Sequence, residues 1–114
     1  MEKVVRAFPI TSREALSKFA AGVEKYSAED RKKFFSNFNN ATEDWFYQEI
    51  DGKPYVICVA QGDDLEQGYA NYDKLDDAFS LWFKAQVAEL SNVDVNKTPK
   101  GPESEHVFCF TKGS

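Results

Sequence analysis

The chain has few of the features that nucleic-acid binding, membrane insertion or export require. Its longest basic cluster is the short run Arg31-Lys32-Lys33, and the 114 residues carry a formal net charge of −5. This balance lacks the electrostatic footprint of a nucleic-acid-binding protein. No apolar run approaches the roughly 18 residues of a membrane span, and the first residues, M-E-K-V-V-R, lack the layout of a signal peptide. We therefore expect a cytoplasmic protein with neither a nucleic-acid nor a membrane partner.

Residues that commonly bind metals or carry out catalysis are also scarce. His106 is the single histidine, and Cys58 and Cys109 are the two cysteines. Their positions do not match the spacing of a structural zinc site or a haem attachment site. The cytoplasm keeps thiols reduced, and each cysteine falls in a predicted strand, so we expect both to be buried structural thiols. No P-loop, G-x-G-x-x-G motif or nucleophile elbow is present, and we expect no cofactor.

Acidic residues cluster in the middle of the chain without a recognised metal-binding pattern. The D-x-[DN]-x-[DN]-G loop of an EF-hand is missing among them. We interpret them as a solvated acidic surface and predict no metal site. These residues are Asp63, Asp64, Glu66, Asp73, Asp76 and Asp77.

Aromatic residues, in contrast, are abundant. The chain has ten Phe, five Tyr and two Trp, and 42% of its residues are hydrophobic. Large aromatic side chains dominate both cores and interfaces. A chain of this length and composition folds as one globular domain, and we assign residues 1–114 to it.

The strongest local pattern is a β-hairpin between residues 43 and 61. Two runs rich in β-branched and aromatic residues flank Asp51-Gly52, and an Asp-Gly pair between such runs is typical of a two-residue turn. Counting outward from this turn places the following pairs on one face: Gln48 with Tyr55, Phe46 with Ile57, and Asp44 with Val59. The other face then holds Tyr47 with Val56, Trp45 with Cys58, and Glu43 with Ala60. Neither face is polar, so we expect helices to cover one face and the sheet of a second subunit to cover the other.

The remaining elements follow from hydrophobic spacing and capping patterns. Strands are expected at residues 3–8 and 105–111, and helices at about 12–25 and 73–90. A second short helix should carry Phe34, Phe35 and Phe38. Residues 37–42, 62–71 and 92–104 are expected to be loops or irregular. This order of elements predicts an α+β fold of the ferredoxin-like βαββαβ type, with a four-stranded antiparallel sheet and the helices on one face.

With these elements the chain resembles the dimeric α/β-barrel superfamily. The resemblance rests on residues 3–8, the hairpin around Asp51-Gly52, the amphipathic segment 73–90 and residues 105–111. In that superfamily two ferredoxin-like subunits press their open sheet faces together. Its members include cofactor-free monooxygenases, muconolactone isomerase, haem-degrading proteins and many domains of unknown function, and the chain looks most like the last group. The resemblance implies a homodimer formed through the open sheet face, and it does not choose among these chemistries.

Several side chains are candidates for a ligand-binding site. Arg6 lies in the middle of a strand among apolar residues, so it needs a carboxylate partner such as Glu49 or Glu105, or an anionic ligand, unless its head reaches water. Trp45, Tyr47 and Tyr55 suit either a pocket for a flat aromatic ligand or the core. His106 is a candidate general base or a histidine at the sheet edge that binds water.

Three hypotheses about function remain open. The first is a module that binds a small hydrophobic or aromatic ligand between the sheet and the helices. The second is a cofactor-free monooxygenase or isomerase in which Tyr47 or His106 is catalytic. The third is a structural or regulatory protein that associates with itself and has no catalytic activity.

Overall fold

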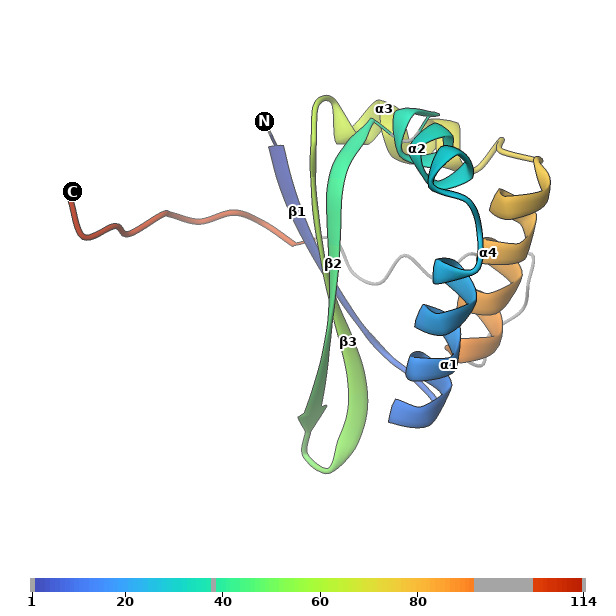
Figure 1. The fold of residues 1–114 in the computed structure, drawn as a ribbon. Helices are drawn as coiled ribbons and strands as arrows, with labels where there is room; N and C mark the ends of the chain where they lie inside the picture. Colours follow the sequence, from blue (N-terminus) through green and yellow to red (C-terminus); the bar gives the residue numbers. More distant parts are fainter. Residues whose placement is uncertain (1, 38, 92–103, 114) are drawn as a thin grey trace.

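The structure, a computed structural model, describes residues 2–37, 39–91 and 104–113 (Figure 1). In these residues the chain forms three strands and four helices. The elements are, in order, β1 (Glu2–Pro9), α1 (Arg13–Glu24), α2 (Ala28–Asn37), β2 (Asn40–Ile50), β3 (Lys53–Gly62), α3 (Leu65–Tyr72) and α4 (Ala78–Leu90). The helices lie on one face of the sheet, which makes a two-layer α+β arrangement.

The hairpin prediction is confirmed pair by pair. Asp51 and Gly52 have φ of 53° and 74°, and two positive φ values are what a type I′ turn requires. Ile50 pairs with Lys53, and the pairs continue to Glu43 with Ala60. A register shift lies between Asn40 and Thr42. The turn therefore determines which side chains of β2 and β3 point toward the helices.

The sheet is antiparallel and has the strand order β1-β3-β2. Arg6 of β1 lies beside Cys58, and Cys58 lies beside Trp45. Because side chains alternate between the two faces of a strand, Phe8 shares the helix-covered face with this row. Val5, Ile57 and Phe46 belong to the opposite face, which we call the open face.

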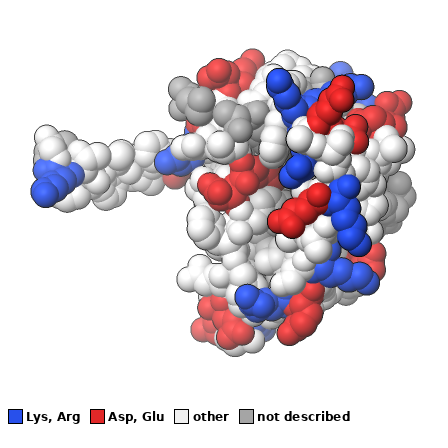
Figure 2. All heavy atoms as spheres, in the orientation of Figure 1, with Lys and Arg blue, Asp and Glu red and all other residues white. Residues whose placement is uncertain are grey.

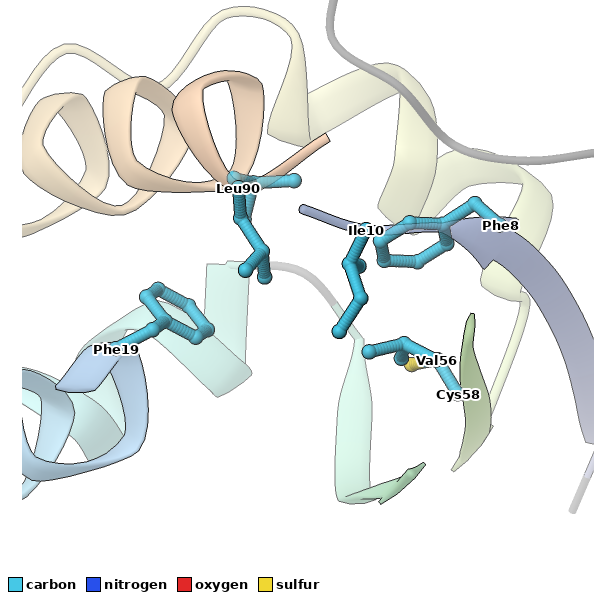
Figure 3. Close-up of a cluster of buried hydrophobic side chains, with 7 residues drawn as sticks. Phe8, Ile10, Phe19, Val56, Cys58 and Leu90 are labelled. Atoms are coloured by element: carbon cyan, nitrogen blue, oxygen red, sulfur yellow. The ribbon is translucent and has the colours of Figure 1, made fainter. Parts of the chain in front are cut away.

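The core lies between the sheet and the pair formed by α1 and α4. One buried cluster contains Phe8, Ile10, Phe19, Val56, Cys58, Val87 and Leu90 (Figure 3). Ser12 caps α1 by accepting a hydrogen bond from Ala15 N at 3.1 Å. The backbone N–H of Thr11 donates to Leu90 O at 2.9 Å, and this bond joins the start of α1 to the end of α4.

A second cluster, made almost entirely of aromatic rings, lies under α2. Phe34, Tyr72 and Phe79 are buried there. The Phe34 ring meets the Phe79 ring at 5.2 Å and an interplanar angle of 83°, which is the edge-to-face geometry that aromatic pairs favour. The predicted short helix is therefore α2, which directs Phe34 and Phe35 into this cluster. Phe38, also predicted for this helix, lies outside the described residues.

Two predicted boundaries in the second half of the chain are wrong. Residues 62–71, expected to be a loop, contain α3, because Leu65, Gly68 and Tyr72 are buried at helical spacing. The following helix begins at Ala78 and not near residue 73, because Asp77 caps it by accepting a hydrogen bond from Ser80 N. The expected loop at 37–42 is also shorter, since β2 already begins at Asn40.

The predicted fourth strand is not formed within the described part of the chain. Residues 104–113, which we call the C-terminal arm, are all exposed and belong to no strand. The arm leads away from the body on the side of the sheet opposite the helices (Figure 1). Its Cys109 is therefore exposed, contrary to our expectation, whereas Cys58 is buried. Of the predicted irregular segment 92–104, residues 92–103 lie outside the described residues.

The helices described here give no evidence of a transmembrane segment. Among residues 2–37, 39–91 and 104–113, no helix has both the length and the apolar character needed to cross a bilayer. Acidic and basic side chains are scattered over the body, while the arm is mostly uncharged (Figure 2).

Candidate functional site

A hollow between the sheet and the helices contains the main candidate site. It has a volume of about 300 Å³. Its floor is the helix-facing side of β2, where Glu43 and Trp45 alternate with residues of the open face. Its walls come from α1, α2 and α4 and include Phe19, Phe34 and Phe83. An apolar hollow with a few polar groups is the usual form of a small-molecule site.

Aromatic contacts hold the floor of the hollow in place. The Trp45 ring lies 5.2 Å from the Phe19 ring and 6.2 Å from the Phe83 ring, measured between centroids. It also meets Phe8 edge to face at 5.8 Å. Three neighbours from different elements therefore fix the indole, and its N–H donates to Glu43 Oε1.

Glu43 is the polar centre of the floor. Its side chain is half-buried. Burial, and then the charge of Glu43 and a hydrogen bond with it, raise the pKa of the Cys58 thiol. Burial and then Glu43 also raise the pKa of Tyr72. Cys58 therefore stays a protonated thiol and is not an activated nucleophile, which agrees with the structural role predicted for it.

Arg6 lies beside this centre, under α3. Its guanidinium stands over the Tyr69 ring at 4.4 Å from the centroid, a favourable cation–π geometry. Burial raises the pKa of Tyr69, and the hydrogen bond and positive charge of Arg6 partly oppose this rise. The strand position predicted for Arg6 is correct, and its main aromatic contact comes from α3, the helix that the sequence did not reveal.

Of the other predicted site residues, Tyr47 and Glu49 lie toward the hairpin turn. The Tyr47 hydroxyl donates to Glu49 Oε1 at 2.9 Å, and Arg13 stands 5.9 Å from the Tyr47 ring centroid. Burial, and then the hydrogen bond to Glu49, raise the pKa of Tyr47. This hydroxyl is protonated at neutral pH and is poorly suited to act as a general base.

The structure does not bring Trp45, Tyr55 and His106 together. Tyr55 pairs with Gln48 and so belongs to the open face, opposite Trp45. His106 lies on the exposed C-terminal arm. Of the predicted site residues, Trp45 therefore lines the hollow. Arg6 lies outside its lining, on β1, against the Tyr69 ring.

Sequence reasoning missed three polar residues of the hollow, Glu24, Arg31 and Glu43. Glu43 was placed correctly in the hairpin register but was not singled out. The signal was available: a carboxylate shares a strand face with Trp45 and Tyr47, and such a half-buried acid needs a partner. Arg31 lies on α2, and the position of that helix over β2 is a tertiary feature.

A second groove lies between α1 and α4. It has a volume of about 820 Å³ and includes Lys18, Ala21, Trp82 and Gln86. It is more polar than the hollow. Gly22 also lines it, and because a Cβ at this position would lie 2.6 Å from the Trp82 ring, glycine allows this close approach of α1 and α4.

In the part of the chain that the structure describes, no three His, Cys, Asp or Glu side chains gather as a metal site would require.

Comparison of the chain with protein-family models, with curated proteins and with solved structures finds no match.

Proposed function

We propose that the chain binds a small, mostly apolar aromatic molecule in the hollow over β2. The observation that carries this proposal is the combination of a hollow of about 300 Å³ with Glu43 and Trp45 at its floor. This volume lies at the lower end of ligand pockets, which run from about 300 to 1,000 Å³. The ligand would be about one or two fused rings in size.

The lining also indicates the chemistry of the ligand. Phe19, Phe34 and Phe83 offer ring faces and edges, so an aromatic ligand would find favourable offset or edge contacts. The Glu43 carboxylate can accept a hydrogen bond, which favours a hydroxyl or amine on the ligand. We favour binding over turnover because Tyr47 and His106, the candidate catalytic residues, do not line the hollow.

Titration with 2-naphthol, which has two fused rings and one hydroxyl donor, tests this proposal. The readout is the NMR signal of each indole N–H. Trp45 belongs to the hollow and Trp82 to the α1–α4 groove, so the two signals distinguish the two places. We expect the Trp45 signal to move and to saturate, since its N–H donor contacts Glu43.

Two neighbouring alanines of α1 provide the variant and its control. Ala20 lines the hollow and Ala21 lines the groove, and both are exposed. Ala20→Phe should fill the hollow and weaken 2-naphthol binding about tenfold or more, which corresponds to about 1.4 kcal/mol. Ala21→Phe should leave it unchanged. A Trp45 signal that does not respond, or equal losses in the two variants, would contradict the proposal.

A second proposal concerns self-association, and a separate observation favours it. Phe46 is 56% exposed and Ile50 is 41% exposed on the open face, where Phe46 pairs with Ile57 and Val5 pairs with Val59. Contiguous exposed apolar surface of this kind marks an interaction site. We propose that two copies form a homodimer through their open faces, as the resemblance to dimeric α/β-barrel proteins implies.

A further inference from the structure

The outer edge of β1 is a place where a further strand can bind. The sheet order β1-β3-β2 leaves β1 at one edge, and within the described residues no strand pairs with its outer side. The N–H of Val5 points there, because it donates to Ser104 Oγ at 3.0 Å. Since backbone groups alternate along a strand, Lys3 and Ala7 present their N–H and C=O groups to the same side.

The C-terminal arm has the residue pattern of a strand. His106, Phe108 and Phe110 alternate with Val107, Cys109 and Thr111. Val107, Phe108 and Phe110 are 79%, 73% and 84% exposed. Isolated exposed hydrophobic residues are ordinary, but three within four positions of one extended segment are a liability unless something covers them.

The arm cannot use the edge of its own β1 efficiently. Ser104 already lies beside Val5, at the middle of that strand. From Ser104 onward, the arm can therefore pair with only one half of β1. This half is Glu2–Val4 or Arg6–Pro9, depending on the direction in which the arm runs. A seven-residue strand over residues 105–111 would extend beyond either half. When two copies exchange their arms, each Ser104 leaves its own Val5, and the eight-residue β1 edge is then long enough for the partner's strand.

The direction of the arm also indicates a second copy. It leaves the body on the side of the open face (Figure 1), which is where the partner lies in the dimer proposed above. The other sheet edge is less suitable, because β2 carries Glu43, Asp44 and Glu49, and charged residues commonly protect an edge strand from pairing. The centre of β1 is mostly apolar, with Val4, Val5 and Ala7.

We infer that two copies exchange their C-terminal arms, so that residues 105–111 of one copy add as a fourth strand to the β1 edge of the other. Each sheet then has four strands, one of them from the partner. The exchange pairs the outward N–H and C=O groups of β1 and covers the apolar side chains of the arm. The inference rests on the proposed homodimer.

Paramagnetic NMR on full-length chains tests the exchange. One chain carries a nitroxide on Cys109, which is exposed, whereas Cys58 is buried. The other chain is isotope-labelled, carries Cys109→Ser and is mixed in equal amount after exchange of subunits. We expect the amide signals of Lys3, Val5 and Ala7 in the isotope-labelled chain to broaden and to recover when the nitroxide is reduced. Treating the Cys109→Ser chain with the same reagent checks that Cys58 is not labelled.

A pair of proline variants in the nitroxide chain distinguishes strand pairing from mere proximity. In a strand, consecutive N–H groups point to opposite edges, and proline lacks this donor. One of Val107→Pro and Phe108→Pro should therefore remove the broadening, while the other should largely keep it. Equal effects of the two variants would overturn the strand pairing.

The outcomes separate this inference from the dimer on which it rests. A wild-type chain that is monomeric in light scattering overturns both. A dimer with no broadening in the mixed sample overturns the exchange alone. Broadening that occurs only when nitroxide and isotope label are on the same chain would show that the arm folds back on its own β1, and this also overturns the exchange.

Discussion

At the scale of single residues, Glu43 links the fold to the candidate site. It accepts a hydrogen bond from Trp45 Nε1 and lines the hollow. Its position depends on the irregular entry into β2, where the register shifts between Asn40 and Thr42. The backbone at this entry therefore controls the floor of the hollow.

Gly62 makes that entry possible, and an alanine in its place should destabilise the protein. A Cβ at Gly62 would lie 1.9 Å from the carbonyl oxygen of Asn39, and the same oxygen accepts a hydrogen bond from Asp63 N at 3.2 Å. Overpacking of this kind costs about 1–3 kcal/mol. We expect Gly62→Ala to lower the free energy of unfolding in urea by this amount and to weaken 2-naphthol binding.

Gly113→Ala is the matched control, since a Cβ at Gly113 meets nothing within 4 Å. Its unfolding curve should overlay that of the wild type. A Gly62→Ala protein of unchanged stability would show that the Asn39 turn shifts without cost, and that the hollow does not depend on this close approach.

Individual residues were predictable from the sequence where a strand position determined them. Placing Arg6 mid-strand and Trp45 beside Cys58 needed only alternation and one turn. His106 followed the same reasoning, yet it lies on the exposed arm, because the neighbour of a strand is a tertiary property that alternation does not reveal. The cation–π contact of Arg6 with Tyr69 was hidden for the same reason.

At the scale of elements, the hairpin was predictable and α3 was not. Asp-Gly between two β-rich runs combines turn chemistry and strand propensity, so both signals indicate one structure. The segment from Leu65 to Tyr72 contains Gly68 and Asn71, which both have weak helix propensity. Burial of Leu65 and Tyr72 against the body overrides that weak local preference.

The start of α4 gives a prediction about pH. Asp77 accepts hydrogen bonds from Ser80 N at 3.1 Å and from Ser80 Oγ at 2.6 Å. Burial alone would raise the pKa of Asp77, but these hydrogen bonds and the nearby Lys33 hold it below its usual value. A carboxyl with a lowered pKa stabilises the fold above its unfolded pKa of about 3.9, and this contribution is lost as the pH falls through the folded value.

Asp77→Ala should therefore lower the free energy of unfolding near neutral pH by about 1 kcal/mol. The difference from the wild type should shrink below about pH 4, as the wild-type carboxyl becomes protonated. Urea unfolding at several pH values measures both effects. Asp76→Ala is the control, because Asp76 is exposed and immediately precedes the cap. Equal losses in the two variants would mean that general acidity, and not the cap, stabilises α4.

At the scale of the whole molecule, the sheet has one covered face and one open face. Apolar residues on both faces of the hairpin led us to expect cover on both sides, and helices cover only one of them. The sequence could not show whether residues 105–111 form a fourth strand of this sheet. A strand at the end of the chain has the same residue pattern whether it pairs with its own sheet or with that of another copy.

The open face provides the test of the proposed homodimer. Phe46 lies on this face, beside Ile57, and is 56% exposed, while Leu81 on α4, in the helix layer, is 53% exposed. Phe46→Asp would place a charge in the dimer contact, where it would be desolvated without a partner. We expect a monomer by light scattering at micromolar concentration, whereas Leu81→Asp should keep the dimer. A stable interface buries about 1,000 Å² or more. Because a charge buried in it without a partner is costly, one such charge should shift the monomer–dimer equilibrium strongly toward the monomer. If both variants remain dimeric, the copies associate through another surface, and the open face must have a different partner.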